Sequence, residues 1–155
     1  QIDRMAELGV TPSFFSAHTY YWGDRHAAIF MGPERAANMS PARWALDAGV
    51  RFSSHLDTPV TPMLPLQAVW SQVERESTSG VVIGPAQRIG RMPALRAVTI
   101  DAAWQVFMDD EIGSIELGKR ADLVVLSENP LTAEDIRSIK VDRTVIDGAT
   151  VYARL

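Results

Sequence analysis

The chain has 155 residues, 46% of them hydrophobic, and carries a formal net charge of −4 at pH 7. This is the length of one ordinary domain, with enough apolar side chain for a sizeable core. Without clustered lysine and arginine, the composition excludes nucleic acid and anionic membranes as partners. The absence of cysteine excludes disulfides, thiolate metal sites and a cysteine nucleophile.

The N-terminal segment indicates a piece of a longer protein. Residues 1–8 already read as the body of a helix, with Ile2, Met5 and Leu8 spaced three apart, and the first residue is Gln. No signal-peptide pattern is present, and no apolar run approaches the roughly 20 residues that a membrane-spanning helix needs. We therefore expect a soluble, cytoplasmic protein with no membrane partner, in which Gln1 is an internal position.

Two helix-to-strand steps are predicted in the first part of the chain. Gly9 and Gly49 suit the left-handed end of a helix, Ser40 and Pro41 open the second helix, and Pro59 ends the second strand. The predicted elements are a helix over 1–8, a strand over 11–17, a loop over 18–35, a helix over 41–49 and a strand over 50–56.

The middle of the chain adds two more predicted helices, over 66–77 and 93–107, separated by a Gly/Pro loop. Together with the two helix-to-strand steps, they fit repeated β/α units, whose strands are parallel and buried on both faces. The fold class expected for residues 1–110 is therefore α/β.

The tail changes character near residue 110. Residues 113–119 read as a short apolar element between turns, and a strand is predicted over 122–127. Two further strands, over 139–146 and 150–154, flank Asp147-Gly148, which is a strong hairpin signal. Residues 111–155 are therefore expected to form a second part built from antiparallel strands.

Asp57 is the main candidate for chemistry. Side chains alternate along a strand, so Ser53, His55 and Asp57 share one side, with Asp57 at the carboxyl end, where barrel enzymes place catalytic groups. A carboxylate there can bind a cation, accept a proton from water and pass it to a leaving amine. The alternative is that its side chain only caps the turn before Thr58-Pro59. The residues alone leave both interpretations open.

The loop predicted over 18–35 offers a second set of candidates. His18, Tyr20 and Trp22 could line a substrate pocket, with His18 polarising a carbonyl or binding metal, although a structural role is equally compatible with His18. We expect His26 to be solvated or structural, and His55 to be a buried, hydrogen-bonded histidine that supports Asp57. No motif for phosphate, dinucleotide or paired-histidine metal binding is present, so any metal site is incomplete.

The tail segment Gly113-Ser114-Ile115-Glu116-Leu117-Gly118-Lys119, continuing through Leu126, resembles the return from barrel to β-sandwich in the amidohydrolase superfamily. The segment His55 to Val60 resembles the eighth-strand aspartate region of its family-3 branch, of the formamide deformylase type. Residues 18–26 and 94–103 resemble the same branch, so the resemblance covers essentially the whole chain in order.

The resemblance implies a (β/α)₈ TIM barrel of which this chain supplies the last two β/α units, plus the final part of a small β-sandwich. Asp57 would be a metal ligand and the general base of a hydrolase that cleaves a C–N bond of an amide or formamide-like small molecule with a metal-activated water. The implied cofactor is a divalent metal, with zinc the expected ion.

The resemblance also implies that the remaining ligands would precede Gln1. Lys119 and Lys140 match no ligand position, and we expect the isolated piece to be inactive. The rival interpretation is a non-catalytic, barrel-derived binding module in which Asp57 caps a turn. A homodimer is left open.

Overall fold

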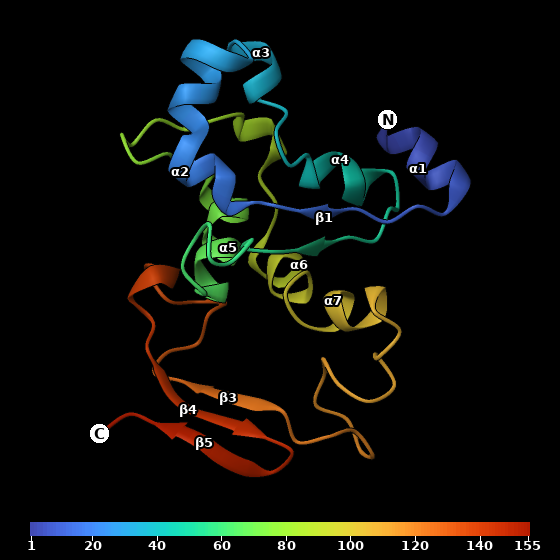
Figure 1. The fold of residues 1–155 in the computed structure, drawn as a ribbon, viewed down its shortest axis with the longest axis vertical. Helices are drawn as coiled ribbons and strands as arrows, with labels where there is room; N and C mark the ends of the chain where they lie inside the picture. The colour runs from blue at the N-terminus through green and yellow to red at the C-terminus, as the bar shows by residue number, and fades with distance from the viewer.

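A computed structural model describes all of residues 1–155 and contains two separate sheets. Strands β1 (Ser13–Phe14) and β2 (Ser53–Ser54) form a parallel pair. Strands β3 (Leu123–Leu126), β4 (Val141–Ile146) and β5 (Ala149–Ala153) form an antiparallel sheet in that order. The parallel pair lies between helices α2 and α3 at one end of the molecule and the antiparallel sheet at the other (Figure 1).

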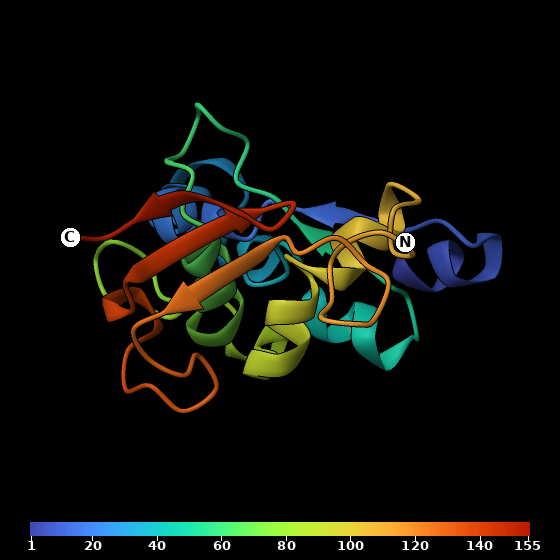
Figure 2. The same ribbon diagram turned by 90° about the horizontal axis from the view of Figure 1, so that it is seen from below.

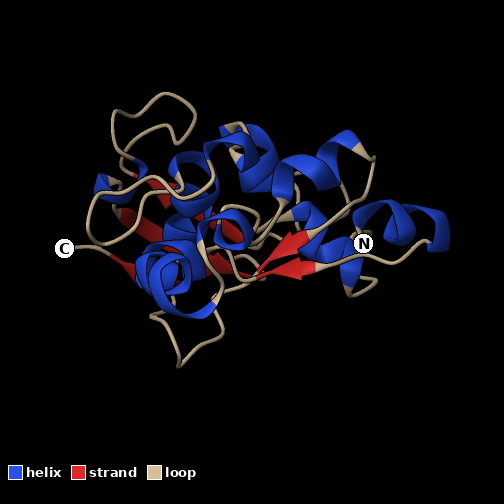
Figure 3. Ribbon diagram, turned by 90° about the horizontal axis from the view of Figure 1, so that it is seen from above, coloured by secondary structure: helices blue, strands red, loops and turns tan.

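Helices surround the parallel pair (Figure 3). The α-helices are α1 (Ile2–Leu8), α2 (Ala17–Arg25), α3 (Pro33–Ala36), α4 (Ala42–Asp47), α5 (Pro65–Glu74), α6 (Arg91–Arg96) and α7 (Ile100–Gln105). A π-helix, η1 (His26–Phe30), and two 3₁₀ turns, η2 (Pro85–Gln87) and η3 (Ile136–Ser138), complete the set. None of these helices is long and apolar enough to cross a bilayer.

The parallel pair confirms the predicted helix-to-strand steps, and Gly9 and Gly49 follow α1 and α4 with φ of 66° and 68°. Both strands are shorter than expected. On the side of β2 away from β1, the Ser54 N–H donates to the carbonyl of Ala97, 2.8 Å away in the segment after α6. A carbonyl from a loop therefore occupies the edge of β2 where a third strand would pair, and the sheet stays two-stranded.

The segment predicted as a loop over 18–35 is helical instead, running through α2, η1 and α3. Gly23, which lies in the segment predicted as a loop, is part of α2, where a Cβ would lie 2.9 Å from Ile83 Cγ1. Close packing, not backbone freedom, accounts for this glycine. The helix predicted over 93–107 is also divided, into α6 and α7, because Thr99 has φ −129° and ψ −104°.

The main core lies between the parallel pair and the helices. Its rings include Phe14 and Phe52, whose centroids are 5.2 Å apart. The buried members are Ala42, Ala45, Val50, Phe52, Val69, Trp70, Ile89, Ala94, Ala97, Ala133, Ile136 and Ile139. Because Ile136 and Ile139 come from the tail, the antiparallel sheet is anchored to the same core as the β/α part.

The antiparallel sheet confirms the predicted hairpin: Asp147 and Gly148, with φ of 49° and 78°, form the two-residue turn between β4 and β5. Its three strands lie side by side in Figure 2. Residues 113–119 form turns and no strand, and Gly113 (φ 91°) is required because a Cβ would lie 2.7 Å from that of Ala103. The division at residue 110 and the second layer of a sandwich stay predictions.

Candidate functional site

Asp57 lies beyond the carboxyl end of β2, with an exposed side chain and a left-handed backbone (φ 54°). The turn that follows is closed by main chain, with the Val60 N–H donating to the Asp57 carbonyl at 2.8 Å. The Asp57 carboxylate takes part in no ion pair. The side-chain hydrogen bonds of this turn come from Thr58 and Thr61. The carboxylate is therefore not the cap of the turn and is free to bind.

Three side-chain hydrogen bonds, two of them buried and one part-buried, hold the base of this turn. Thr61 is only 1% exposed, and its hydroxyl donates to the carbonyl of buried Leu56. Ser16 Oγ lies 2.6 Å from Ser54 Oγ and donates to the Ala68 carbonyl at 3.0 Å. Together these contacts connect the segment after β1, the end of β2 and helix α5 next to the turn that begins at Asp57. A cavity of about 340 Å³ beside Asp57 is lined by Ser54, His55, Leu56, Asp57, Thr58, Met63, Pro65, Ala68 and Val98.

Replacing Thr61 tests whether this turn is pinned from inside. Thr61→Val keeps the shape of the side chain but leaves the Leu56 carbonyl without its partner, so we expect the free energy of unfolding to fall by about 1–2 kcal/mol. Chemical denaturation measures the change. The matched control is Thr58→Val in the same turn, where the exposed hydroxyl contacts only Met63 Sδ, at 3.9 Å. Equal effects of the two changes would contradict the assignment.

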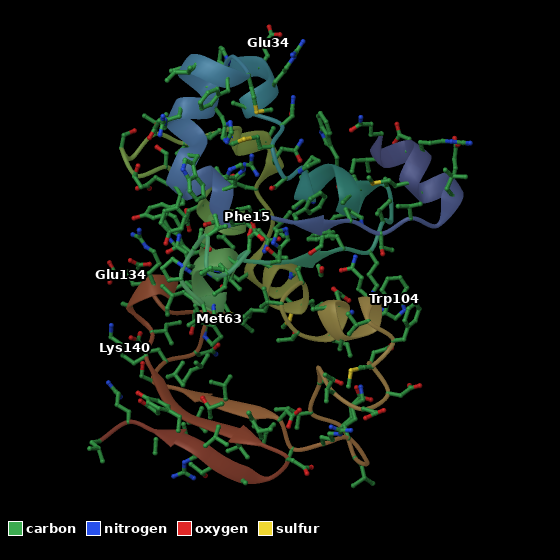
Figure 4. All side chains as sticks on the ribbon, in the orientation of Figure 1. Phe15, Glu34, Met63, Trp104, Glu134 and Lys140 are labelled. Carbon is green, nitrogen blue, oxygen red and sulfur yellow. The ribbon has the colours of Figure 1, made fainter.

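A histidine–aromatic cluster, formed by Phe15, His18, Trp22, His26 and His55, lies beside this turn. His18, Trp22 and His26 are four residues apart and share one face of the continuous helix α2–η1. The Phe15 ring, labelled in Figure 4 where β1 leads into α2, stacks on His18 at 5.0 Å and on His55 at 5.1 Å. His18 Nε2 is 3.3 Å from His26 Nε2, and the His18 and Trp22 rings meet edge to face at 5.0 Å.

The pKa of His18 is influenced both by its neighbours in this cluster and by Asp57. Burial lowers the pKa of His18 below its ordinary value, neighbouring His26 lowers it further, and the Asp57 carboxylate acts in the opposite direction. The neutral form of His18 is thereby favoured near neutral pH. A neutral imidazole beside a carboxylate can donate or accept a hydrogen bond without adding charge to the site.

Only some of the site residues predicted from the sequence lie together in the structure. Tyr20, two residues from His18 on a helix, falls on the opposite side, where its ring meets Trp70 at 5.4 Å. His26, expected to be solvated or structural, is half-buried and contacts His18, which is compatible with the structural role. His55 stacks on Phe15 and does not support Asp57 through a hydrogen bond. The spacing of 18, 22 and 26 would have revealed the cluster had the segment been predicted as a helix.

The donor groups of this chain suit a contribution to a metal site. Asp57 presents a free carboxylate, and oxygen ligands of this kind bind hard and borderline divalent cations. Nowhere do three or more His, Cys, Asp or Glu side chains come together as a set that could hold a metal ion. Lys119 is engaged by Ser114 Oγ at 2.6 Å and Glu116 at 3.1 Å. The residues present therefore fit one ligand position, not a complete metal site.

Comparison with known proteins gives a consistent result. The chain is 34% identical to N-substituted formamide deformylase of Arthrobacter pascens over 99% of its own length and 29% of that protein. It is 32% identical to protein LONG AFTER FAR-RED 3 of Arabidopsis thaliana, over 97% of the chain and 26% of that protein. The chain thus spans less than a third of these relatives.

Solved structures share the fold at lower identity. An amidohydrolase from Thermotoga maritima superposes with a TM-score of 0.69 at 24% identity, covering 99% of this chain and 34% of that one. An uncharacterized metal-dependent hydrolase from Pyrococcus horikoshii gives 0.73 at 20% identity, covering 87% and 28%. The mixed α/β architecture is therefore that of part of these hydrolases. The model of the amidohydrolase family matches residues 1–152, and the chain belongs to that family.

Proposed function

We propose that this chain forms part of a metal-dependent hydrolase of C–N bonds, in which Asp57 is a metal ligand and the general base. One observation carries the proposal: at the carboxyl end of β2, where barrel enzymes place their catalytic groups, Asp57 presents a carboxylate with no internal partner. Family membership supports hydrolysis of amide-type bonds. The proposal assigns the other ligands to residues outside these 155, and within the chain no three His, Cys, Asp or Glu side chains come together.

The proposed chemistry is hydrolysis of an amide or formamide-like bond. A bound divalent cation, with zinc the expected ion, would polarise the substrate carbonyl and ease deprotonation of water. Asp57 accepts a proton from the attacking water as the new C–O bond forms. The carboxylic acid then delivers that proton to the nitrogen as the C–N bond breaks, so that an amine leaves and the carboxylate is restored.

We further propose that His18 and Trp22 line the substrate side of this site. Trp22 offers an apolar wall with a polar edge, and His18 stands between Phe15 and Trp22 with a ring nitrogen available for the substrate carbonyl. Tyr20 would contribute through Trp70, which its ring contacts, and not by touching the substrate.

Metal removal tests the proposed function. We expect dialysis of the intact protein against a chelator to abolish hydrolysis of N-substituted formamides and simple amides, and zinc to restore it, because the cation supplies the activated water. Metal analysis before and after dialysis, beside a screen of amides and matched esters, measures both properties. Undiminished turnover by metal-free protein would overturn the proposal.

A further inference from the structure

The contact between His18 and His26 joins two equivalent atoms. Nε2 of each ring lies 3.3 Å from Nε2 of the other, with the ring centroids 4.6 Å apart and the planes at 67°. A hydrogen bond between these two nitrogens requires that one ring donates an N–H and the other accepts with an unprotonated nitrogen. The contact therefore fixes which nitrogen carries the proton in each ring, once the direction of donation is known.

The second nitrogen of each ring gives the direction. Nδ1 of His26 is buried and has no hydrogen-bond partner. If His26 accepted at Nε2, its proton would sit on Nδ1, and a buried N–H without an acceptor is rare in folded proteins.

His18 differs in the position of its free nitrogen. Its Nε2 faces His26, whereas its Nδ1 has no partner within the chain and is not among the buried unpartnered atoms, so it remains solvent-accessible. The ring is held by the stacked Phe15 at 5.0 Å and by the edge of Trp22 at 5.0 Å. One nitrogen is thus committed to His26 and the other is available to a ligand.

We infer that His26 is a positioning residue that donates from Nε2 to His18 Nε2 and so holds His18 as the Nδ1–H tautomer, a hydrogen-bond donor for the substrate carbonyl oxygen. The hydrogen bond at one ring nitrogen sets the proton at the other, as it does for metal-binding and catalytic histidines. The inference deepens the proposed role of His18 in substrate binding and rests on it.

Nitrogen NMR of the intact protein, labelled in the histidine rings, tests the tautomers directly, with His18→Gln assigning the His18 signals. We expect His18 protonated on Nδ1 and His26 on Nε2. His26→Gln should preserve the His18 tautomer because its amide N–H can donate, whereas His26→Ala should abolish it. A proton on Nε2 of His18 would overturn the inference, and so would Nδ1 protonation of both rings, which a metal ion shared by the two Nε2 atoms would impose.

Activity supplies the second readout. His26→Ala should lower kcat/KM by about 10-fold, and His26→Gln should restore most of it. Phe30→Leu is the packing control, because Phe30 contacts the His26 ring at 5.8 Å without sharing its hydrogen bond. If Phe30→Leu disturbs the His18 tautomer as much as His26→Ala, packing explains the effect and the inference fails. Correct tautomers with full activity in His18→Gln would remove the substrate role alone.

Discussion

Asp57→Asn in the intact protein should lower the rate of amide hydrolysis by about 10²–10⁴-fold, the range for loss of a general base. Asparagine keeps the size of the side chain and an oxygen that can still approach a cation, but it cannot take the proton of water. The fold should be unaffected, because the carboxylate makes no ion pair and the turn is closed by the Val60 N–H and the Asp57 carbonyl.

The measurement is kcat and KM for an amide substrate, together with metal content and thermal unfolding. Asp47→Asn is the matched control: the same change in an exposed residue at the end of α4, where Asp47 pairs only with Arg43 at 3.4 Å. It should change neither rate nor metal content. Near-normal turnover by Asp57→Asn with metal fully bound would rule out Asp57 as the base.

Gly84→Ala should have the largest effect on stability. A Cβ at this position would lie 1.8 Å from the Ala37 carbonyl oxygen, a main-chain atom, and the backbone is left-handed (φ 63°). Overpacking and left-handed strain together predict a loss of about 2–5 kcal/mol in the free energy of unfolding.

The surroundings of Gly84 leave little room for relief. The Ala37 and Met39 carbonyls accept hydrogen bonds from the buried Arg75 guanidinium at 3.4 and 2.8 Å, and Arg75 Nε donates to the Ile83 carbonyl at 2.8 Å. Burial lowers the pKa of Arg75 to about 10. A shift of residue 37 away from a new methyl group would therefore weaken contacts of a buried cation as well.

Gly80→Ala separates the two contributions to this loss. Gly80 is also left-handed (φ 83°), but no atom lies within 4 Å of an added Cβ. Its substitution should cost only the backbone strain, about 1–2 kcal/mol. Denaturant unfolding of both variants gives the comparison. Similar losses would contradict the close approach of residue 84 to the Ala37 carbonyl.

Local features of the sequence predicted much of the fold. The φ preference of glycine located the ends of α1 and α4, and Asp147-Gly148 located the hairpin between β4 and β5. Apolar patterns predicted α5 and the antiparallel strands. Each of these depends on residues within a few positions of one another, so the sequence is sufficient to predict it. The alternation of side chains in the second strand did not indicate that Phe52 and Leu56 would be buried, as they are in the structure.

The candidate site was predicted less completely. The sequence indicated that the site lies after β2. It also showed the resemblance of residues 113–126 to amidohydrolases, and the match to the family model confirms that resemblance. The roles of Asp57, His18 and Trp22 stay proposals. Whether Asp57 caps its turn was open in the sequence, and the answer depended on which oxygen accepts the Val60 N–H.

What the sequence by itself determined is the order of β/α steps, the hairpin and the place of Asp57, because propensity and periodicity act locally. Only the tertiary structure decided that residues 17–30 are helical, that His26 meets His18 and that Tyr20 turns toward Trp70. The physical reason is packing between residues that are far apart in the sequence. The absence of a side chain at Gly23 leaves room for Ile83 to pack against α2. Helix α2 packs one face against α5, and its other face lies toward Phe15 and Asp57.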